Sequence, residues 1–338
     1  LEELERVEKQ EELKAQASKE LDDLKQKDHY DYNVYQKLTL ALNNITADSL
    51  RESKLFKQYP FFRDQVEFCA DINKNILPLS VDETLTQVVY RKDPENEKRI
   101  IKGMNSTGVN ELFNTGDMLT TVLKDVFQNV NVYEDRVRLL QYPFDSPISE
   151  NGIGFYRYYI MDTTYVEKEK CFQLSFVPNN PQDFGFTGTL YILADSTFRL
   201  KQCVLNLPAK TDVNFVESLR MVQGVGALPT GEWGQQTDDM LCEMNFFGGH
   251  FMVRRVTRNS DYAFEEISPT IFKRKGKEIK EVNAMMRDEE FWNQYRAQTD
   301  LTKSESNMGN FIDNLANIKG LKYIMIGLKA LIESYVET

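Results

Sequence analysis

The sequence is poor in the side chains from which metal sites and nucleophilic active sites are most often built. It has only two histidines, His29 and His250, and four widely separated cysteines with no CxxC pair: Cys69, Cys171, Cys203 and Cys242. This pattern predicts neither a zinc site nor a dense disulfide framework. His29 ends the charged N-terminal segment and His250 follows a Gly-Gly pair, so we expect two unrelated surface imidazoles, no metal ion and no cofactor.

Catalytic motifs are missing as well. The sequence contains no HExxH, no GxSxG, no GxxxxGK[ST] and no GxGxxG that opens a helix after a strand. Two acidic pairs, Asp238–Asp239 and Glu265–Glu266, could serve general acid–base chemistry. Neighbouring residues on a strand point to opposite faces, however, which makes a shared-proton dyad poor. We expect solvated carboxylates and no enzymatic activity; a hydrolase is kept as the second alternative.

Positive charge and long hydrophobic runs are also scarce. Lysine and arginine number 41 against 52 aspartates and glutamates, and the net charge is −11. Phosphate backbones need clustered basic residues, so nucleic acid is not expected as a partner, and an anionic lipid surface is disfavoured for the same reason. The most apolar segment of the C-terminal part, residues 318–336, is interrupted by three lysines and a glutamate, which predicts an amphipathic helix and no membrane span.

Alternation of apolar and polar residues dominates what is present. From Tyr30 the apolar side chains fall on even positions, as in a strand with one wet face. Strands are also predicted at residues 83–90 and 98–102, followed by a series of short ones at residues 155–161, 171–177, 186–193, 198–207, 213–223, 240–247 and 251–258. Turn residues separate them at the spacing of an antiparallel meander. The predicted fold class is α+β: a curved, mainly antiparallel sheet, a half-barrel packed against one main helix.

Three segments are expected along the chain. Residues 1–29 predict a charged N-terminal helix or linker, residues 30–270 the sheet domain, and residues 271–338 a connector and C-terminal helices. The main helix is predicted at residues 110–128, where apolar side chains recur at spacings of three, four and seven. Residues 51–80 are predicted to be irregular because Pro60 and Pro78 argue against helix. Thr302 and Glu305 form a capping-box pattern that predicts a helix start.

Large aromatic side chains are concentrated on a few of these strands. As core, they would pack beneath the helix at residues 110–128; alternatively, they could line a site for an acyl chain or apolar peptide. The candidate residues for such an apolar pocket are Tyr156, Tyr158, Phe172, Phe176, Phe186 and Trp233. The core interpretation accounts for them without any ligand.

The order of several segments resembles a known family. YNVYQKLTLALNNI, ILPLSVDETLTQVVYRKDPENEKRIIKG, GFYRYYIMDT, CFQLSFVPNN and FGFTGTLYILADSTFRL are similar to Bacteroidetes outer-membrane proteins of unknown function described as carboxypeptidase-regulatory-like-domain proteins. The resemblance runs from about Tyr30 to the C-terminus. It implies a periplasmic module at the outer membrane, followed by a C-terminal β-barrel that would be its partner, with the signal peptide outside this chain, and it supplies no catalytic residues. The run from Phe172 to Ile192 also resembles the lipoprotein-carrier (LolA-like) fold.

These observations favour a noncatalytic periplasmic binding or scaffold module of an outer-membrane β-barrel protein, with a role in envelope assembly or transport. The first alternative is a carrier or chaperone for a lipid or other hydrophobic ligand. An envelope protein is the other expected kind of partner.

Overall fold

The computed structural model describes residues 24, 26–109, 130–139, 142–207, 216–246, 249–297 and 299–318. The helix predicted at residues 110–128 lies outside these residues, as does nearly all of the predicted N-terminal helix. The division of the chain into three segments stays a prediction.

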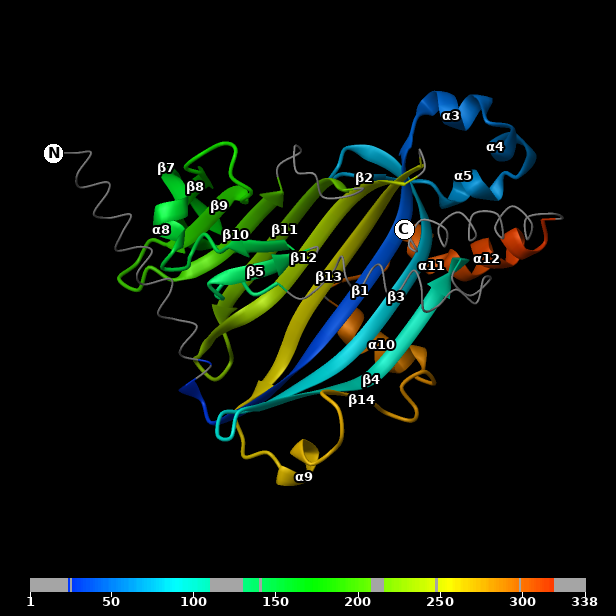
Figure 1. The fold of residues 1–338 in the computed structure, drawn as a ribbon. Coiled ribbons are helices and arrows are strands. Elements are labelled where there is room, and N and C mark those ends of the chain that lie inside the picture. Colours follow the sequence, from blue (N-terminus) through cyan, green and yellow to red (C-terminus); the bar gives the residue numbers. More distant parts are fainter. Residues whose placement is uncertain are drawn as a thin grey trace.

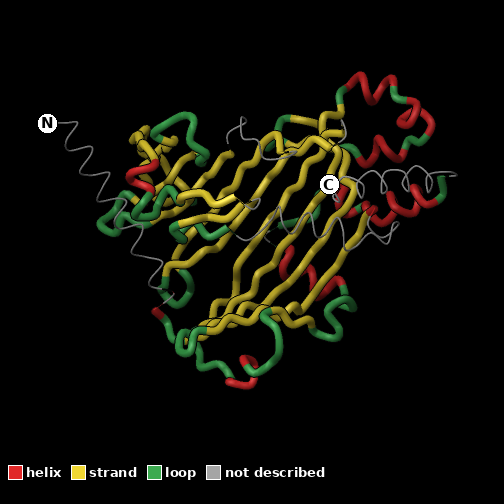
Figure 2. Tube along the Cα trace, viewed as in Figure 1, coloured by secondary structure: helices red, strands yellow, loops and turns green. Residues whose placement is uncertain are grey.

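One large β-sheet dominates the described part of the chain (Figures 1 and 2). Its strands are β1 (His29–Ile45), β2 (Glu67–Cys69), β3 (Lys74–Arg91), β4 (Asn96–Gly108), β7 (Tyr156–Val166), β8 (Glu169–Pro178), β9 (Thr187–Leu193), β10 (Leu200–Leu207), β11 (Val216–Ala227), β12 (Trp233–Phe246), β13 (Gly249–Ala263) and β14 (Glu278–Lys280). A separate two-stranded sheet consists of β5 (Arg136–Leu139) and β6 (Tyr142–Asp145). The curved, mainly antiparallel sheet predicted from the alternating pattern is therefore confirmed.

The first strand joins the two halves of the sheet. The strand order is β14-β4-β3-β1-β13-β12-β11-β10-β9-β8-β7, with β2 paired to β3. Strands β7 to β13 follow one another as a meander, and β1 then pairs antiparallel with β13 on one side and with β3 on the other. Only β14 runs parallel to its neighbour, β4, among the pairings in the described chain. The predicted strands correspond to β1, β3, β4 and β7–β13, with shifts at their ends.

Alternation gives the sheet two different faces. We define the front face as the face that carries Leu40 and its partner Val253, which belong to the largest apolar cluster. The back face carries Tyr35 and its partner Leu85, which pack against Trp292. Figure 1 shows β5 and β6 in front of the sheet and helix α10 behind it.

Short helices lie at the ends and on the back of the sheet. They are α3 (Ala47–Glu52), α4 (Lys54–Gln58), α5 (Phe61–Gln65), α8 (Gly152–Phe155), α9 (Pro269–Phe272), α10 (Glu289–Arg296), α11 (Lys303–Ser306) and α12 (Met308–Ala316). The capping box predicted at the start of α11 is confirmed, because Thr302 accepts a hydrogen bond from the Glu305 amide and Glu305 accepts one from the Thr302 amide. No helix in the described ranges combines the length and the hydropathy that crossing a bilayer requires.

Buried ion pairs fix the C-terminal helices to the back face. The ammonium group of Lys37 on β1 lies 2.7 Å from Glu305 Oε2 on α11, and both side chains are buried. Further along the same face, Glu83 on β3 accepts hydrogen bonds from Tyr35 and from Arg296 of α10. Charged side chains on this face therefore have partners supplied by helices far away in the sequence.

One expectation for the fold was wrong. Residues 51–80 are not irregular: the end of α3, helices α4 and α5, β2 and the first part of β3 occupy them. Pro60 directly precedes α5, where its missing amide hydrogen costs nothing, and Pro78 lies within β3. Phe56 and Phe62 of this region are buried against Phe311 and Ile312 of α12, so tertiary packing stabilises helices that the local pattern did not reveal.

Candidate functional site

The front face of strands β7–β12 carries the largest continuous apolar surface in the described chain. Successive strands place side chains in register on this face: Leu174 pairs with Leu190, Leu190 with Cys203, and Leu205 with Met221. Met221 is paired in turn with Met240, and all of these side chains are buried in one cluster. The sequence produces this surface because apolar residues occupy most of the alternate positions that face this side of each strand.

Four of the six predicted pocket residues meet at the β7 end of this surface. The Tyr156 and Phe176 rings pack edge to face with centroids 5.4 Å apart, and the Tyr158 ring lies 6.2 Å from Phe176. The Tyr156 hydroxyl accepts a hydrogen bond from the Phe186 amide at 3.2 Å. All four side chains are buried within the cluster. Burial raises the pKa of both tyrosines well above the usual range.

The other two predicted residues lie elsewhere on the same cluster. Phe172 on β8 is only partly buried and stacks on Phe198, with centroids 6.5 Å apart. Trp233 begins β12, and its indole donates a hydrogen bond to the Leu200 carbonyl at 3.0 Å. The six residues thus share one apolar cluster but do not converge on a single point. Their role as ligand-binding residues stays a prediction.

A short segment outside the sheet closes the front face. Residues 130–139 and 142–148, which we call the front-face cover, contain β5 and β6 and contribute buried apolar side chains to the cluster: Val130, Val132, Val137, Phe144 and Ile148. The Phe144 ring stacks on Phe186 at 4.4 Å. Strands β5 and β6 pair with each other and not with the large sheet. Apart from the chain connection through α8 into β7, side chains make the contacts between the cover and the sheet that are described below.

Three hydrogen bonds from sheet side chains hold the cover. The hydroxyls of Tyr156 and Tyr158 donate to the carbonyls of Asp145 and Pro147, at 2.7 and 2.6 Å. The Gln223 amide donates to the Val130 carbonyl at 2.6 Å. Each bond pairs a polar side chain of the sheet with a backbone carbonyl of the cover.

A buried ion pair lies beside Gln223 on the same face. Arg255 Nη2 is 2.7 Å from Asp238 Oδ2, and both side chains are almost fully buried. Burial raises the pKa of Asp238, while the neighbouring guanidinium opposes the shift. The pair neutralises two charges inside an apolar environment and, as described, has no free acid or base for chemistry.

The cysteines of this surface are also inert by position. Cys203 and Cys242 are fully buried on the front face and have free thiols. Burial raises the pKa of Cys242 to about 12 and that of Cys203 further still. A thiol reacts as its thiolate, so neither group is suited to nucleophilic attack in the folded chain.

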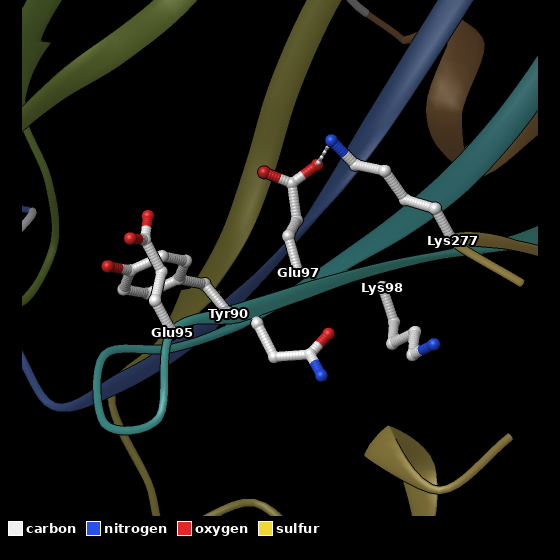
Figure 3. Close-up of a pocket in the computed structure, with 6 residues that line it drawn as sticks. Tyr90, Glu95, Glu97, Lys98 and Lys277 are labelled. Atoms are coloured by element: carbon white, nitrogen blue, oxygen red, sulfur yellow. Dashed lines mark ion pairs between the residues drawn. The ribbon is translucent and has the colours of Figure 1, made fainter.

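A second, polar hollow lies at the β3–β4 turn (Figure 3). It measures about 450 Å³ and is lined by Tyr90, Glu95, Asn96, Glu97, Lys98 and Lys277. Lys277 Nζ is 3.5 Å from Glu97 Oε1, and the Tyr90 ring stacks on Tyr30. None of the predicted pocket residues lies here. The lining mixes both signs of charge and contains no metal-binding cluster of histidine, cysteine or carboxylate side chains, nor does the rest of the described chain.

The two histidines lie apart, as the sequence suggested, but the Asp238–Asp239 pair differs from the expectation. His29 begins β1 and His250 lies near the start of the antiparallel strand β13, so the two imidazoles are at opposite ends of the paired strands. Asp238 and Asp239 face opposite sides of the sheet, paired with Arg255 and Arg258 respectively. They are ion-paired, and Asp238 is buried, so the expectation of solvated carboxylates was wrong for this pair.

Sequence reasoning missed the front-face cover. Its apolar residues are spaced irregularly and alternate over only four residues in each of β5 and β6, which is too short for a periodicity signal. Phe144 and Ile148 near two prolines were the available hint of a packed turn.

Comparisons with known proteins give one family and a set of distant structural likenesses. A search of curated proteins finds no match. Among solved structures, a LolA-superfamily protein from Nitrosomonas europaea has 11% identity and a TM-score of 0.30, covering 78% of this chain and 97% of its own. A DUF1329-family protein from Desulfovibrio piger has 10% identity and a TM-score of 0.30, covering 78% and 96%. An outer-membrane lipoprotein-sorting protein domain from Vibrio parahaemolyticus has 8% identity and a TM-score of 0.27, covering 76% and 97%.

TM-scores this low support no transfer of function or of structural detail. None of these matches bears on the resemblance to Bacteroidetes proteins with a carboxypeptidase-regulatory-like domain, which stays a prediction. A family model, by contrast, matches residues 14–262, about three quarters of the chain. The chain belongs to the family of unknown function DUF5686.

Proposed function

We propose that this chain is a noncatalytic binding module that takes up a ligand with an apolar chain on the front face of its sheet. The observation that carries the proposal is the apolar surface of β7–β12, which among the described residues is covered by the front-face cover. Displacing the cover would open a surface on which each buried methylene group contributes about 0.8 kcal/mol.

The partly buried aromatic pair Phe172 and Phe198 gives such a ligand a place of entry. Both rings pack against the cluster without being fully buried by it. A partly buried aromatic ring can exchange contact with water for contact with an acyl chain at little cost in free energy. Asp238 and Arg255 on this face are paired with each other, so binding would depend mainly on apolar contacts.

We place the module in the cell envelope, on the periplasmic side of the outer membrane, as the resemblance of the sequence implies. Its expected partner there is the β-barrel that would follow it, and its role would be assembly or transport.

A permanent scaffold is the second candidate. It is favoured by the three hydrogen bonds that tie the cover to Tyr156, Tyr158 and Gln223, because a cover so attached can serve as a fixed part of the core. In that case the front face would hold no ligand.

Titration with the fluorescent probe dansyl-undecanoic acid separates the two candidates. A binding module gives a saturable increase in fluorescence. Phe172→Ala should lower the affinity for the probe by about fivefold, because part of an aromatic contact is lost. Phe68→Ala is the matched control, since Phe68 is an exposed phenylalanine on β2, away from the cluster. No saturable signal, or equal effects of both variants, would refute binding on the front face.

A further inference from the structure

The β4 edge of the sheet carries a local reversal of charge. In a chain of net charge −11, residues 273–280 form what we call the basic segment, with exposed side chains of Lys273, Arg274, Lys275, Lys277 and Lys280. Glu278 is the one acidic residue among them. The negative net charge of the whole chain therefore does not describe the charge at this edge.

An apolar loop follows the basic segment directly. Residues 281–287 present Val282, Met285 and Met286, whose side chains are 102%, 70% and 83% exposed. These are the three most exposed large apolar side chains among the described residues. Single exposed apolar residues are ordinary, but three together on one short loop indicate a contact surface.

The apolar loop is held firmly in this exposed conformation. Its middle residue, Ala284, is buried and accepts a hydrogen bond from the Met104 amide at 2.8 Å. Arg287 donates to the Lys102 carbonyl at 2.7 Å and pairs with Glu281 at 2.6 Å. These hydrogen bonds and the ion pair therefore hold the loop in a conformation that exposes the three apolar side chains.

The basic segment is anchored to the same strand. Lys98 on β4 donates a hydrogen bond to the Arg274 carbonyl at 2.9 Å, and the Arg99 amide donates to the Lys277 carbonyl at 2.9 Å. Strand β14, which forms the C-terminal end of the basic segment, has three residues and spans about 10 Å. Both features therefore lie along one edge of the molecule, next to β4 (Figure 1).

We propose that this edge docks on an anionic phospholipid surface. Val282, Met285 and Met286 would enter the boundary between headgroups and acyl chains, while the basic segment contacts the lipid phosphates. Apolar side chains beside a basic cluster are the combination that interfacial binding uses. An acidic protein or a nucleic acid would attract the basic segment but would leave a protruding valine and two methionines unexplained.

Neighbouring carboxylates cancel only part of the charge of this edge. Glu97 is paired with Lys277 at 3.5 Å, whereas Glu281 is paired with Arg287 and Glu289 with Arg296. The ion pairs of the described residues do not include Lys273, Arg274, Lys275 or Lys280. The inference does not rest on ligand uptake by the front face, because none of its residues belongs to the front-face cluster.

Co-sedimentation of the full chain with vesicles tests the proposal. Vesicles of phosphatidylcholine alone are compared with vesicles of phosphatidylcholine and phosphatidylglycerol, at low and high salt. We expect binding to the anionic vesicles only, weakened by salt. Two variants should each reduce the bound fraction at least about tenfold. The glutamate variant is Lys273→Glu/Lys275→Glu, and the serine variant is Val282→Ser/Met285→Ser/Met286→Ser.

Two control variants carry matched changes at the opposite edge of the sheet. Met161→Ser/Tyr165→Ser removes exposed apolar side chains from β7, and Arg157→Glu/Lys170→Glu reverses exposed charges on β7 and β8. Both should bind vesicles like the unaltered chain. Circular dichroism of every variant confirms that the fold is intact.

Several results would overturn the proposal. Equal binding to both kinds of vesicle, or no binding to either, would do so, as would equal losses in the control variants. A loss in the glutamate variant without a loss in the serine variant would also overturn it, because charge alone would then bind the vesicles and the apolar loop would not enter the bilayer. Probe binding by the front face is expected to be unchanged in the edge variants, so the two proposals fail separately.

Discussion

Glu83 at the centre of the back-face network offers a sharp test of how the C-terminal helices are held. Its carboxylate accepts hydrogen bonds from Tyr35 at 2.7 Å, from Arg296 Nε at 2.6 Å and from Asn105 at 3.0 Å, and a further one from Arg296 Nη2. The Glu83 side chain is 1% exposed and that of Arg296 is 10% exposed. Glu83→Gln keeps the shape and removes the charge.

The expected cost follows from what the substitution leaves behind. Removing one partner of a buried ion pair destabilises a protein by about 3–5 kcal/mol. Arg296 keeps a second partner, Glu289, at 2.7 Å, so we expect the lower end, about 3 kcal/mol. The matched control is Glu289→Gln, which removes the 75% exposed partner of the same arginine and should cost less than about 1 kcal/mol.

Urea unfolding at neutral pH measures both values. Glu83→Gln should lower the midpoint by about 1 M urea at an unchanged slope. Equal, small shifts for Glu83→Gln and Glu289→Gln would refute the idea that this buried pair fixes α10 to the sheet.

The same residue predicts a pH dependence. Burial alone would raise the pKa of Glu83, but hydrogen bonds from Arg296, Tyr35 and Asn105 lower it below its usual range. The stabilisation from the carboxylate is therefore complete above about pH 4.3, the ordinary glutamate pKa, and is lost as the pH falls through the lowered value. The unaltered chain should lose stability over this acidic window, and Glu83→Gln should lose less.

Further predictions concern the front face. Tyr158→Phe removes the hydrogen bond to the Pro147 carbonyl and should lower the free energy of unfolding in urea by about 1–2 kcal/mol. Tyr165→Phe changes an exposed position on β7 and should have no measurable effect. Equal effects of the two substitutions would contradict the anchoring role of Tyr158. Gly188→Ala would place a methyl group 1.9 Å from the Val204 carbonyl oxygen and should lower the stability by about 1–3 kcal/mol. Gly154→Ala is the control, because its methyl group would meet nothing within 4 Å. An unchanged stability of Gly188→Ala would show that β9 can shift. The four buried cysteines should react with Ellman's reagent only after unfolding, because burial disfavours their thiolates; rapid reaction of the native chain would contradict the packing.

The sheet could be predicted because each strand repeats one simple pattern over many residues. The alternation from Tyr32 to Leu42 in β1 is a local signal that predicts a strand. The expectation of one wet face was wrong, because Lys37 and Thr39 are buried against Glu305 of α11. The partners of β1 were not predictable in this way. Pairing of β1 with β13 joins residues more than two hundred positions apart, such as Leu40 and Val253, and no local signal specifies that choice.

The candidate site was predicted in part for the same reason. The aromatic content of β7 and β8 indicated a large apolar surface, and Tyr156, Tyr158 and Phe176 do share it. Its closure by Phe144 and Val137 depends on how a short irregular segment folds back, which is a tertiary effect. The basic run at residues 273–280 is visible in the sequence, but its place beside β4 and the exposure of the neighbouring Val282, Met285 and Met286 depend on tertiary structure.

The most direct test of the proposed binding function is hydrogen–deuterium exchange of the full chain with and without dansyl-undecanoic acid. If the front-face cover gives way to an apolar chain, peptides spanning residues 130–148 should exchange faster in the presence of the probe, while peptides from β10 and β12 should stay protected. Unchanged exchange across residues 130–148 at saturating probe would contradict the account and leave a permanent scaffold.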